Sequence, residues 1–289
     1  MPLSSSVVGS ATTLMETRVD SRWTMAFAAG IGDLSPRYLD TRRPEGLVAH
    51  PLFPVCVEWP VVLAARHLAD EGLLAREEAA RGIHLGHDLT VHRLVRPGDV
   101  LSTTATVDGV SRHRAGALQE LRLETVNSSG AAVSTTRMST LFLGVDVDGD
   151  DRPAQDGAEV GGGAPTEGTE LAVGVDLHGG DAHVYSECSR IWNPIHTDPV
   201  VAEAAGLPGI ILHGTATLAL AVTAVVDRFG GGDPGRVSRL GGRFGAMVPL
   251  PSQVEIRAWP SGPSTVGFEV VTADGGRAVR GGFVQLDDG

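Results

Sequence analysis

Few residues in this chain combine reactive side chains with a spacing that favours chemistry, and most of them lie between Tyr185 and Gly214. His196 closes the sequence Asn-Pro-Ile-His, and His213 stands immediately before a glycine that opens a long apolar run. Histidine is the side chain whose ordinary pKa suits acid–base catalysis near neutral pH. By residue type alone a single loop histidine is more often structural, and we expect His213 to orient the entry to the following helix. Cys188 has no visible partner base and is interpreted as a small buried residue.

Two other segments have a metal-like spacing but lack a ligand set. His84, His87 and His92 stand close in sequence, but strand alternation places His84 and His87 on opposite faces, and no Cys or carboxylate cluster accompanies them. The stretch Asp-Val-Asp-Gly-Asp-Asp resembles the start of a calcium loop. Asp151, however, stands where that loop needs glycine, and Gly157 where it needs a bidentate Glu. We therefore expect no metal site.

Composition excludes several classes of protein. All 23 basic residues among the 289 are Arg, which excludes lysine Schiff bases, pyridoxal-phosphate lysines and P-loop lysines. A net charge of −12 with only 7 Phe, 4 Trp and 2 Tyr argues against a nucleic-acid partner. Two cysteines fit a reducing compartment. The first residues lack a signal-peptide pattern, and the longest apolar run, 209–226, contains a histidine and several threonines. We therefore expect a cytoplasmic protein without a membrane span or membrane partner.

The chain divides into two halves of similar length. Residues 145–168 are rich in Asp and Gly and are predicted to link an N-terminal domain, 1–144, to a C-terminal domain, 169–289. The halves repeat one pattern, because Gly-Asp-Leu-Ser-Pro-Arg-Tyr at 32–38 lies 158 positions before Arg-Ile-Trp-Asn-Pro-Ile-His at 190–196.

An apolar helix follows each repeated segment and is predicted at 53–73 and at 215–229. Behind each helix come alternating segments typical of antiparallel strands. The predicted strands are 87–94, 100–107, 118–126 and 132–143 in the first half, and 237–244, 253–259, 265–272 and 277–285 in the second. The pattern predicts an α+β fold of two helix-plus-sheet repeats, a pseudo-dimer in one chain.

The segments around His196 and His213 resemble the MaoC-like, (R)-specific enoyl-CoA hydratase and dehydratase family. The family signature runs Tyr…Gly-Asp-x-Asn-Pro-[Ile/Leu]-His-x-Asp…Ala…[Ile/Val]-His-Gly. This chain has Tyr185, then Arg-Ile-Trp-Asn-Pro-Ile-His-Thr-Asp, then Leu-His-Gly. The first half is similar to the degenerate N-terminal domain of this family, with its Gly-Asp element and a later Arg-Pro-Gly-Asp turn at 96–99. The resemblance implies a double hot dog, in which two sheets wrap two central helices.

The resemblance also implies roles for individual residues. In the family an Asp and a His five positions apart share the acid–base catalysis on a 2-enoyl or 3-hydroxyacyl thioester. A backbone N–H at the start of the central helix donates a hydrogen bond to the thioester oxygen. Here His196 takes the His position, Asn193 the Asn position, and Gly214 the position of the glycine that supplies the N–H. The catalytic Asp falls on Ile191, which cannot carry a proton.

Neither half holds a complete Asp–His pair, since the first half has Asp33 in the Asp position but Tyr38 in the His position. Three interpretations remain open. The chain is a hydratase in which Glu187 or Asp181 replaces the missing carboxylate, or it catalyses a different His-dependent reaction such as isomerisation, cyclisation or conjugate addition, or it only binds acyl thioesters. Pairing of Asp33 with His196 across the pseudo-twofold is a further alternative.

The function we predict is hydration or dehydration of a 2-enoyl/3-hydroxyacyl thioester in fatty acid or polyketide metabolism, with His196 as acid and base. No cofactor is expected, because CoA or the phosphopantetheine of an acyl-carrier protein forms part of the substrate. Without Lys, its phosphates must meet Arg side chains or backbone N–H groups. The arginines predicted to do so are Arg93, Arg96, Arg239 and Arg243. A homodimer is compatible with this fold.

Overall fold

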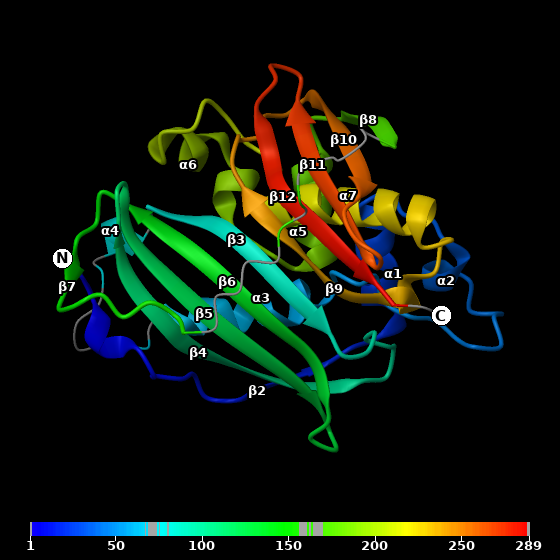
Figure 1. Cartoon of the computed structure of the whole chain (residues 1–289), viewed down its shortest axis with the longest axis horizontal. Coiled ribbons are helices and arrows are strands. Elements are labelled where there is room, and N and C mark those ends of the chain that lie inside the picture. The colour runs from blue at the N-terminus through cyan, green and yellow to red at the C-terminus, as the bar shows by residue number, and fades with distance from the viewer. Residues whose placement is uncertain are drawn as a thin grey trace.

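The computed structural model describes residues 2–66, 68, 74, 76–79, 81–155, 161, 163 and 170–287. Its main feature is one antiparallel sheet, drawn in Figure 1. The ten strands of this sheet follow in the order β2 (Met15–Arg18), β4 (Val100–His113), β5 (Gly116–Asn127), β6 (Ala132–Leu143), β3 (Gly82–Val91), β9 (Val237–Phe244), β12 (Arg277–Leu286), β11 (Thr265–Thr272), β10 (Ser252–Pro260) and β8 (Leu171–Leu177).

Two apolar helices lie against one face of the sheet, one from each half of the chain (Figure 1). α3 (Pro54–Ala65) packs on β4, and α7 (Gly214–Phe229) packs on β9, β11 and β12. Both helices contribute to one hydrophobic cluster that continues across the two halves. Within the described residues, no helix is long and apolar enough to cross a lipid bilayer.

The shorter elements surround these layers. Helical segments are α1 (Ser21–Gly30), α2 (Pro36–Leu39), α4 (Arg76–Ala79), α5 (Asp181–Ser189) and α6 (Pro199–Ala204), with single 3-10 turns at η1 (Ser5–Val7), η2 (Pro194–His196) and η3 (Pro234–Arg236). A separate small sheet pairs β1 (Leu3–Ser4) with β7 (Val147–Asp148) in parallel.

The two halves join at the centre of the sheet, where β3 pairs with β9. Asp88 lies opposite Gly241 in this pairing. A Cβ at Gly241 would lie 2.4 Å from the backbone oxygen of His87, so only glycine allows the strands to approach this closely. The repeats therefore share one continuous sheet, and α3 and α7 lie on the same side of it.

The predicted α+β fold of two helix-plus-sheet repeats is confirmed. Residues 132–143, 237–244 and 265–272 form strands with the predicted bounds. The predicted helix at 53–73 is too long, because α3 ends at Ala65 and the guanidinium of Arg66 turns back over the Trp59 ring, 5.6 Å from its centroid. Part of that predicted helix, residues 67 and 69–73, lies outside the described residues.

The predicted linker, 145–168, is described only in part. Its first residues pack on the N-terminal half, since β7 pairs with β1 and Arg152 forms a bridge with Val110. Residues 156–160, 162 and 164–169 lie outside the described part of the chain. The domain boundaries at 144 and 169 stay predictions.

A buried carboxyl on α3 supports a prediction about stability. Glu58 is 3% exposed, and the Thr136 hydroxyl donates to its Oε1 at 2.6 Å. Burial raises the pKa of Glu58 from 4.5 to about 7. Between these values the folded chain holds a proton that the unfolded chain has released, so the free energy of unfolding falls as the pH rises.

Replacing Glu58 by Gln keeps an oxygen for the Thr136 hydroxyl and removes this titration. We expect E58Q to be more stable than the wild type at pH 8 by about 2–3 kcal/mol, and to lose that advantage as the pH falls toward 4.5. Urea unfolding at several pH values measures this difference. Parallel stability curves for the two proteins would contradict the assignment of Glu58.

Candidate active site

The site loop, residues 190–198, connects α5 to α6. Arg190 ends α5 in a left-handed conformation, with φ 62°, which glycine adopts more readily. Its guanidinium lies over the Trp23 ring of the N-terminal half, 4.0 Å from the centroid. At the other end Asp198 caps α6, and its carboxylate accepts the Val200 N–H at 2.9 Å. The loop is therefore fixed at both ends.

His196 is held by the backbone that leads into α7. Its Nδ1 lies 2.8 Å from the Ile211 carbonyl oxygen, which only accepts hydrogen bonds, so Nδ1 carries the proton and Nε2 keeps its lone pair. The ring stacks on His213, with centroids 3.6 Å apart and planes at 25°. Burial lowers the pKa of His196 below its ordinary value of 6.5, and the Ile211 carbonyl opposes this shift. A neutral His196 therefore offers Nε2 as a base.

His213 lies deeper and connects His196 to α5. The Oγ of Ser186 lies 3.3 Å from Nε2 of His213, and the Tyr185 ring lies 4.9 Å from the His213 ring. Burial, and then the nearby His196, lower the pKa of His213 well below its ordinary value. The Ile191 carbonyl faces the ring and opposes this shift, although the contact lies outside regular hydrogen-bond geometry. The stacked pair is therefore neutral near pH 7.

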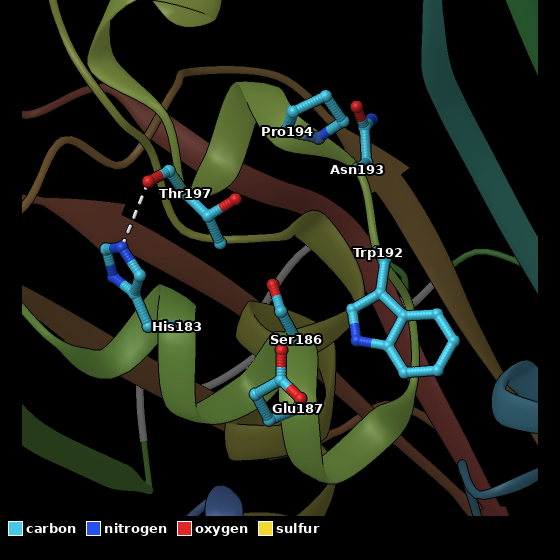
Figure 2. A pocket seen from close by; sticks show the side chains of 7 residues that line it. All are labelled: His183, Ser186, Glu187, Trp192, Asn193, Pro194 and Thr197. Atoms are coloured by element: carbon cyan, nitrogen blue, oxygen red, sulfur yellow. Dashed lines mark hydrogen bonds between the residues drawn. The ribbon is translucent and has the colours of Figure 1, made fainter.

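A cavity of about 240 Å³ opens between α5 and the site loop. Figure 2 shows its lining residues, which are His183, Ser186, Glu187, Trp192, Asn193, Pro194 and Thr197. His183 donates from Nε2 to the Thr197 carbonyl at 3.0 Å, which closes one side. The predicted Asn193 thus borders the cavity. Ser186, which the sequence did not single out, joins the cavity to the histidine pair.

Gly214 is the first residue of α7 and directly follows His213. An N–H at this position has no acceptor within the helix, so it is free to donate to a bound group. A Cβ at Gly214 would lie 2.9 Å from the Phe244 ring of β9. Glycine is therefore required for β9 to pack against the start of α7. The structure places His196 and Gly214 at the same end of this helix.

Ile191 takes the position that the resemblance assigns to the catalytic Asp. It is 6% exposed and packs in the main hydrophobic cluster. Of the two acids predicted as replacements, Glu187 lines the cavity from an exposed position. Asp181 instead accepts the N–H of His178 at 2.8 Å, at the start of α5. Within the described residues His196 forms no ion pair with a carboxylate.

The corresponding region of the N-terminal half forms a closed chain of hydrogen bonds. His50 accepts the Leu52 N–H at Nδ1, so its Nε2 carries a proton and donates to Thr223 Oγ1 at 3.2 Å. The Thr223 hydroxyl donates in turn to Asp33 Oδ2 at 3.0 Å. Tyr38 packs against His50, and burial raises its pKa well above the ordinary value. The side chains of His50, Thr223 and Asp33 are all hydrogen-bonded, which favours a structural role for this network.

The pairing of Asp33 with His196 is not observed. Asp33 is bonded to Thr223, which lies about nine residues further along α7 than Gly214, or about 14 Å at the rise of an α-helix. His196 stacks on His213, immediately before the first residue of α7. The two residues therefore belong to different places on the helix.

A second cavity, of about 290 Å³, lies between α1, β8, α5 and α7. Its apolar lining includes Val175, Leu212, Ala216 and Leu220. Tyr185 also borders it, contacts the His213 ring and donates its hydroxyl to Thr215 at 2.9 Å. An apolar space therefore reaches the back of the histidine pair.

The arginines predicted to bind phosphate have partners within the protein. The acceptors are the Asp99 carboxylate for Arg93, the Asp88 carboxylate for Arg239 and the Glu45 carbonyl for Arg96. Arg243 is exposed on β9, one residue before Phe244. A phosphate arriving at Arg93 or Arg239 would have to compete with a carboxylate held by two hydrogen bonds. Phosphate binding by these arginines stays a prediction.

The expected separation of His84 and His87 is wrong. Their rings lie 5.5 Å apart because a register shift between His84 and Gly86 interrupts the alternation of β3. In the part of the chain that the structure describes, no group of three or more His, Cys, Asp or Glu could hold a metal ion.

Each half of the chain contributes one central helix and part of one shared sheet, and the sheet wraps both helices. This arrangement defines a double hot dog. Solved structures support this fold. The chain aligns with a MaoC-like dehydratase from Phytophthora capsici at a TM-score of 0.85 and 21% identity, covering 98% of this chain and 96% of that one. It also aligns with a Mycobacterium tuberculosis protein described as having a double hotdog fold, at a TM-score of 0.63 and 17% identity over 96% of this chain and 95% of that one.

Sequence comparison assigns each half. Residues 163–279 match the family described as "MaoC like domain", and residues 6–136 match "FAS1-like, dehydratase domain region". Peroxisomal enoyl-CoA hydratase 2 of Arabidopsis thaliana is 33% identical over 96 residues, or 33% of this chain and 30% of that protein. The matches span only about a third of the length of such curated relatives. The chain therefore has the double hot-dog fold, and its C-terminal half carries a region that matches a MaoC-like domain.

Proposed function

We propose that this protein adds water to a 2-enoyl thioester or removes it from a 3-hydroxyacyl thioester. One observation carries the proposal. The unprotonated Nε2 of His196 lies at the same end of α7 as the Gly214 N–H. A base and a donor for a developing oxyanion are the two requirements of this chemistry. The match to a MaoC-like domain and the similarity to the hydratase named above support this substrate class.

In the hydration direction, His196 Nε2 takes a proton from water while the water oxygen bonds to C3 of the thioester. The electron pair of the double bond moves onto the thioester and forms an enolate. The enolate oxygen accepts a hydrogen bond from the Gly214 N–H. Protonated His196 then returns a proton to C2, so the residue ends in its starting state. Asn193 borders the cavity in which the water is held.

The acyl chain fits the apolar cavity beside Leu212 and Ala216. Tyr185 borders this cavity and contacts the His213 ring, so the cavity adjoins the histidine pair. The thiol carrier is CoA or the phosphopantetheine of an acyl-carrier protein. Neither hydration nor dehydration by this route needs a metal or redox cofactor.

A second function is favoured by one specific observation, the apolar Ile191 in the position of the family Asp. A site with one proton carrier is also suited to a His-dependent isomerisation, cyclisation or conjugate addition, or to binding of an acyl thioester without turnover.

Turnover of a panel of 2-enoyl-CoA thioesters tests the proposal. We expect loss of the conjugated enoyl absorbance together with a product one water heavier. Tight binding of the same thioesters with no such product would support the second function instead.

The pH profile of kcat/KM is a separate prediction. His196 must be neutral to accept a proton, and burial lowers its pKa below 6.5. Activity that depends on His196 should therefore be retained at pH 6.5 and decline only at lower pH. Rates measured from pH 4.5 to 8.5 check this, and a decline centred above pH 6.5 would contradict the described environment of His196.

A further inference from the structure

Among the described residues that line the cavity, Ser186 is the one whose side chain is hydrogen-bonded to the histidine pair. It projects from α5 toward the site loop in Figure 2, and its Oγ lies 3.3 Å from Nε2 of His213. The residue as a whole is buried, with 1% exposed. A hydroxyl in this position is ordered by His213 and still faces the space where a reactant would lie.

The hydrogen bond between Ser186 and His213 leaves a lone pair on Ser186 Oγ. The His213 ring is neutral, so one of its nitrogens carries a hydrogen and the other accepts. If Nε2 accepts, the Ser186 hydroxyl donates to it, and if Nε2 carries the hydrogen, it donates to Ser186 Oγ. In both tautomers Ser186 Oγ keeps a lone pair that His213 does not use.

A lone-pair acceptor is what the missing carboxylate would otherwise supply. We propose that Ser186 Oγ accepts a hydrogen bond from the reacting water, or from the 3-hydroxyl of the substrate, in place of the Asp that Ile191 replaces. His213 is the positioning residue that holds Ser186 in this state. Ser186 orients the oxygen, and His196 alone moves the proton. This inference rests on the proposed function.

Other polar groups of the cavity fit this role less well. His183 has its Nε2 engaged with the Thr197 carbonyl. Glu187 is exposed and forms no hydrogen bond or ion pair with either histidine. Ser186 is the lining residue joined to the histidine pair, which fixes its orientation relative to the base.

The test compares variants at Ser186 and His213 with the wild type on the same 2-enoyl-CoA. We expect S186A to lower kcat about 100-fold and to change KM less than threefold, because the lost contact orients the reacting oxygen rather than binding the thioester. S186T keeps the hydroxyl and should recover most of the rate. H213Q keeps an acceptor for the hydroxyl and should remain well above H213L, which removes it.

The control is S134A, which removes a buried hydroxyl on β6 in the other half of the chain. It should leave kcat unchanged, and thermal unfolding establishes that each variant is folded. Wild-type kcat in a folded S186A, or equal rates for H213Q and H213L, would overturn the role of Ser186 while leaving the hydratase function intact. A wild type that hydrates none of the thioesters overturns the proposed function and this role together.

Discussion

Replacing His196 by Ala is expected to lower kcat for hydration of a 2-enoyl thioester by about 10²- to 10⁴-fold, with little change in KM. The reason is that, of the two stacked histidines in the described structure, only His196 keeps an unengaged Nε2. Ile191 cannot titrate, and His213 has its Nε2 engaged by Ser186. The thioester is held by other contacts, so its binding should survive. Initial rates over a range of substrate concentrations separate the two parameters.

His92 offers a matched control for this substitution. It is exposed and lies in the N-terminal half, and its side chain is hydrogen-bonded to the Thr135 hydroxyl. H92A should therefore keep the wild-type rate. Equal kcat values for folded H196A and the wild type would show that His196 is not the base.

Introducing the family carboxylate by Ile191→Asp is expected to destabilise the fold by about 2–5 kcal/mol near pH 7. Ile191 is 6% exposed and packs in the main hydrophobic cluster, so the new carboxyl would lose its water without gaining a described cationic partner. Burial raises the pKa of such a group above its unfolded value near 4. The destabilisation should therefore grow as the pH rises above about 4, up to the pKa in the folded state.

Ile191→Asn separates charge from polarity, because it has nearly the same size and does not titrate. Its loss of stability should be nearly independent of pH, and urea unfolding of both variants from pH 4 to 8 measures the difference. Indistinguishable pH dependence would mean that the side chain at 191 is solvated. Hydration that appears only in I191D would favour the second function over the first.

The strands and the long helices were predictable because the polarity of each side chain follows its burial directly. The alternating segments at 132–143, 237–244 and 265–272 form strands with those bounds, since one face of each is buried against α3 or α7. β8 was missed because it lies at the sheet edge with most of its residues exposed, which removes the alternation. The short helices α1 and α5 were also missed. α1 buries Trp23 and Phe27 on one face but has only ten residues, and α5 carries no strong apolar stripe.

The site was predictable only as far as its motif extends. The Asn-Pro-Ile-His and His-Gly segments identified Asn193, His196 and Gly214, and the structure brings His196 and Gly214 to one end of α7 and places Asn193 on the adjacent cavity. The contact of Ser186 with His213 joins residues 27 positions apart, and no local spacing encodes it. The bond from Thr223 to Asp33 spans 190 positions and likewise depends on the packing of one half on the other.

The addition of ¹⁸O-labelled water to a 2-enoyl-CoA by the wild-type protein, followed by mass analysis of the product, tests the hydratase function directly. We expect a 3-hydroxyacyl thioester that carries one ¹⁸O atom and that forms far more slowly with H196A. A thioester that binds and is recovered without label, or that is labelled at the same rate by both proteins, would contradict this expectation.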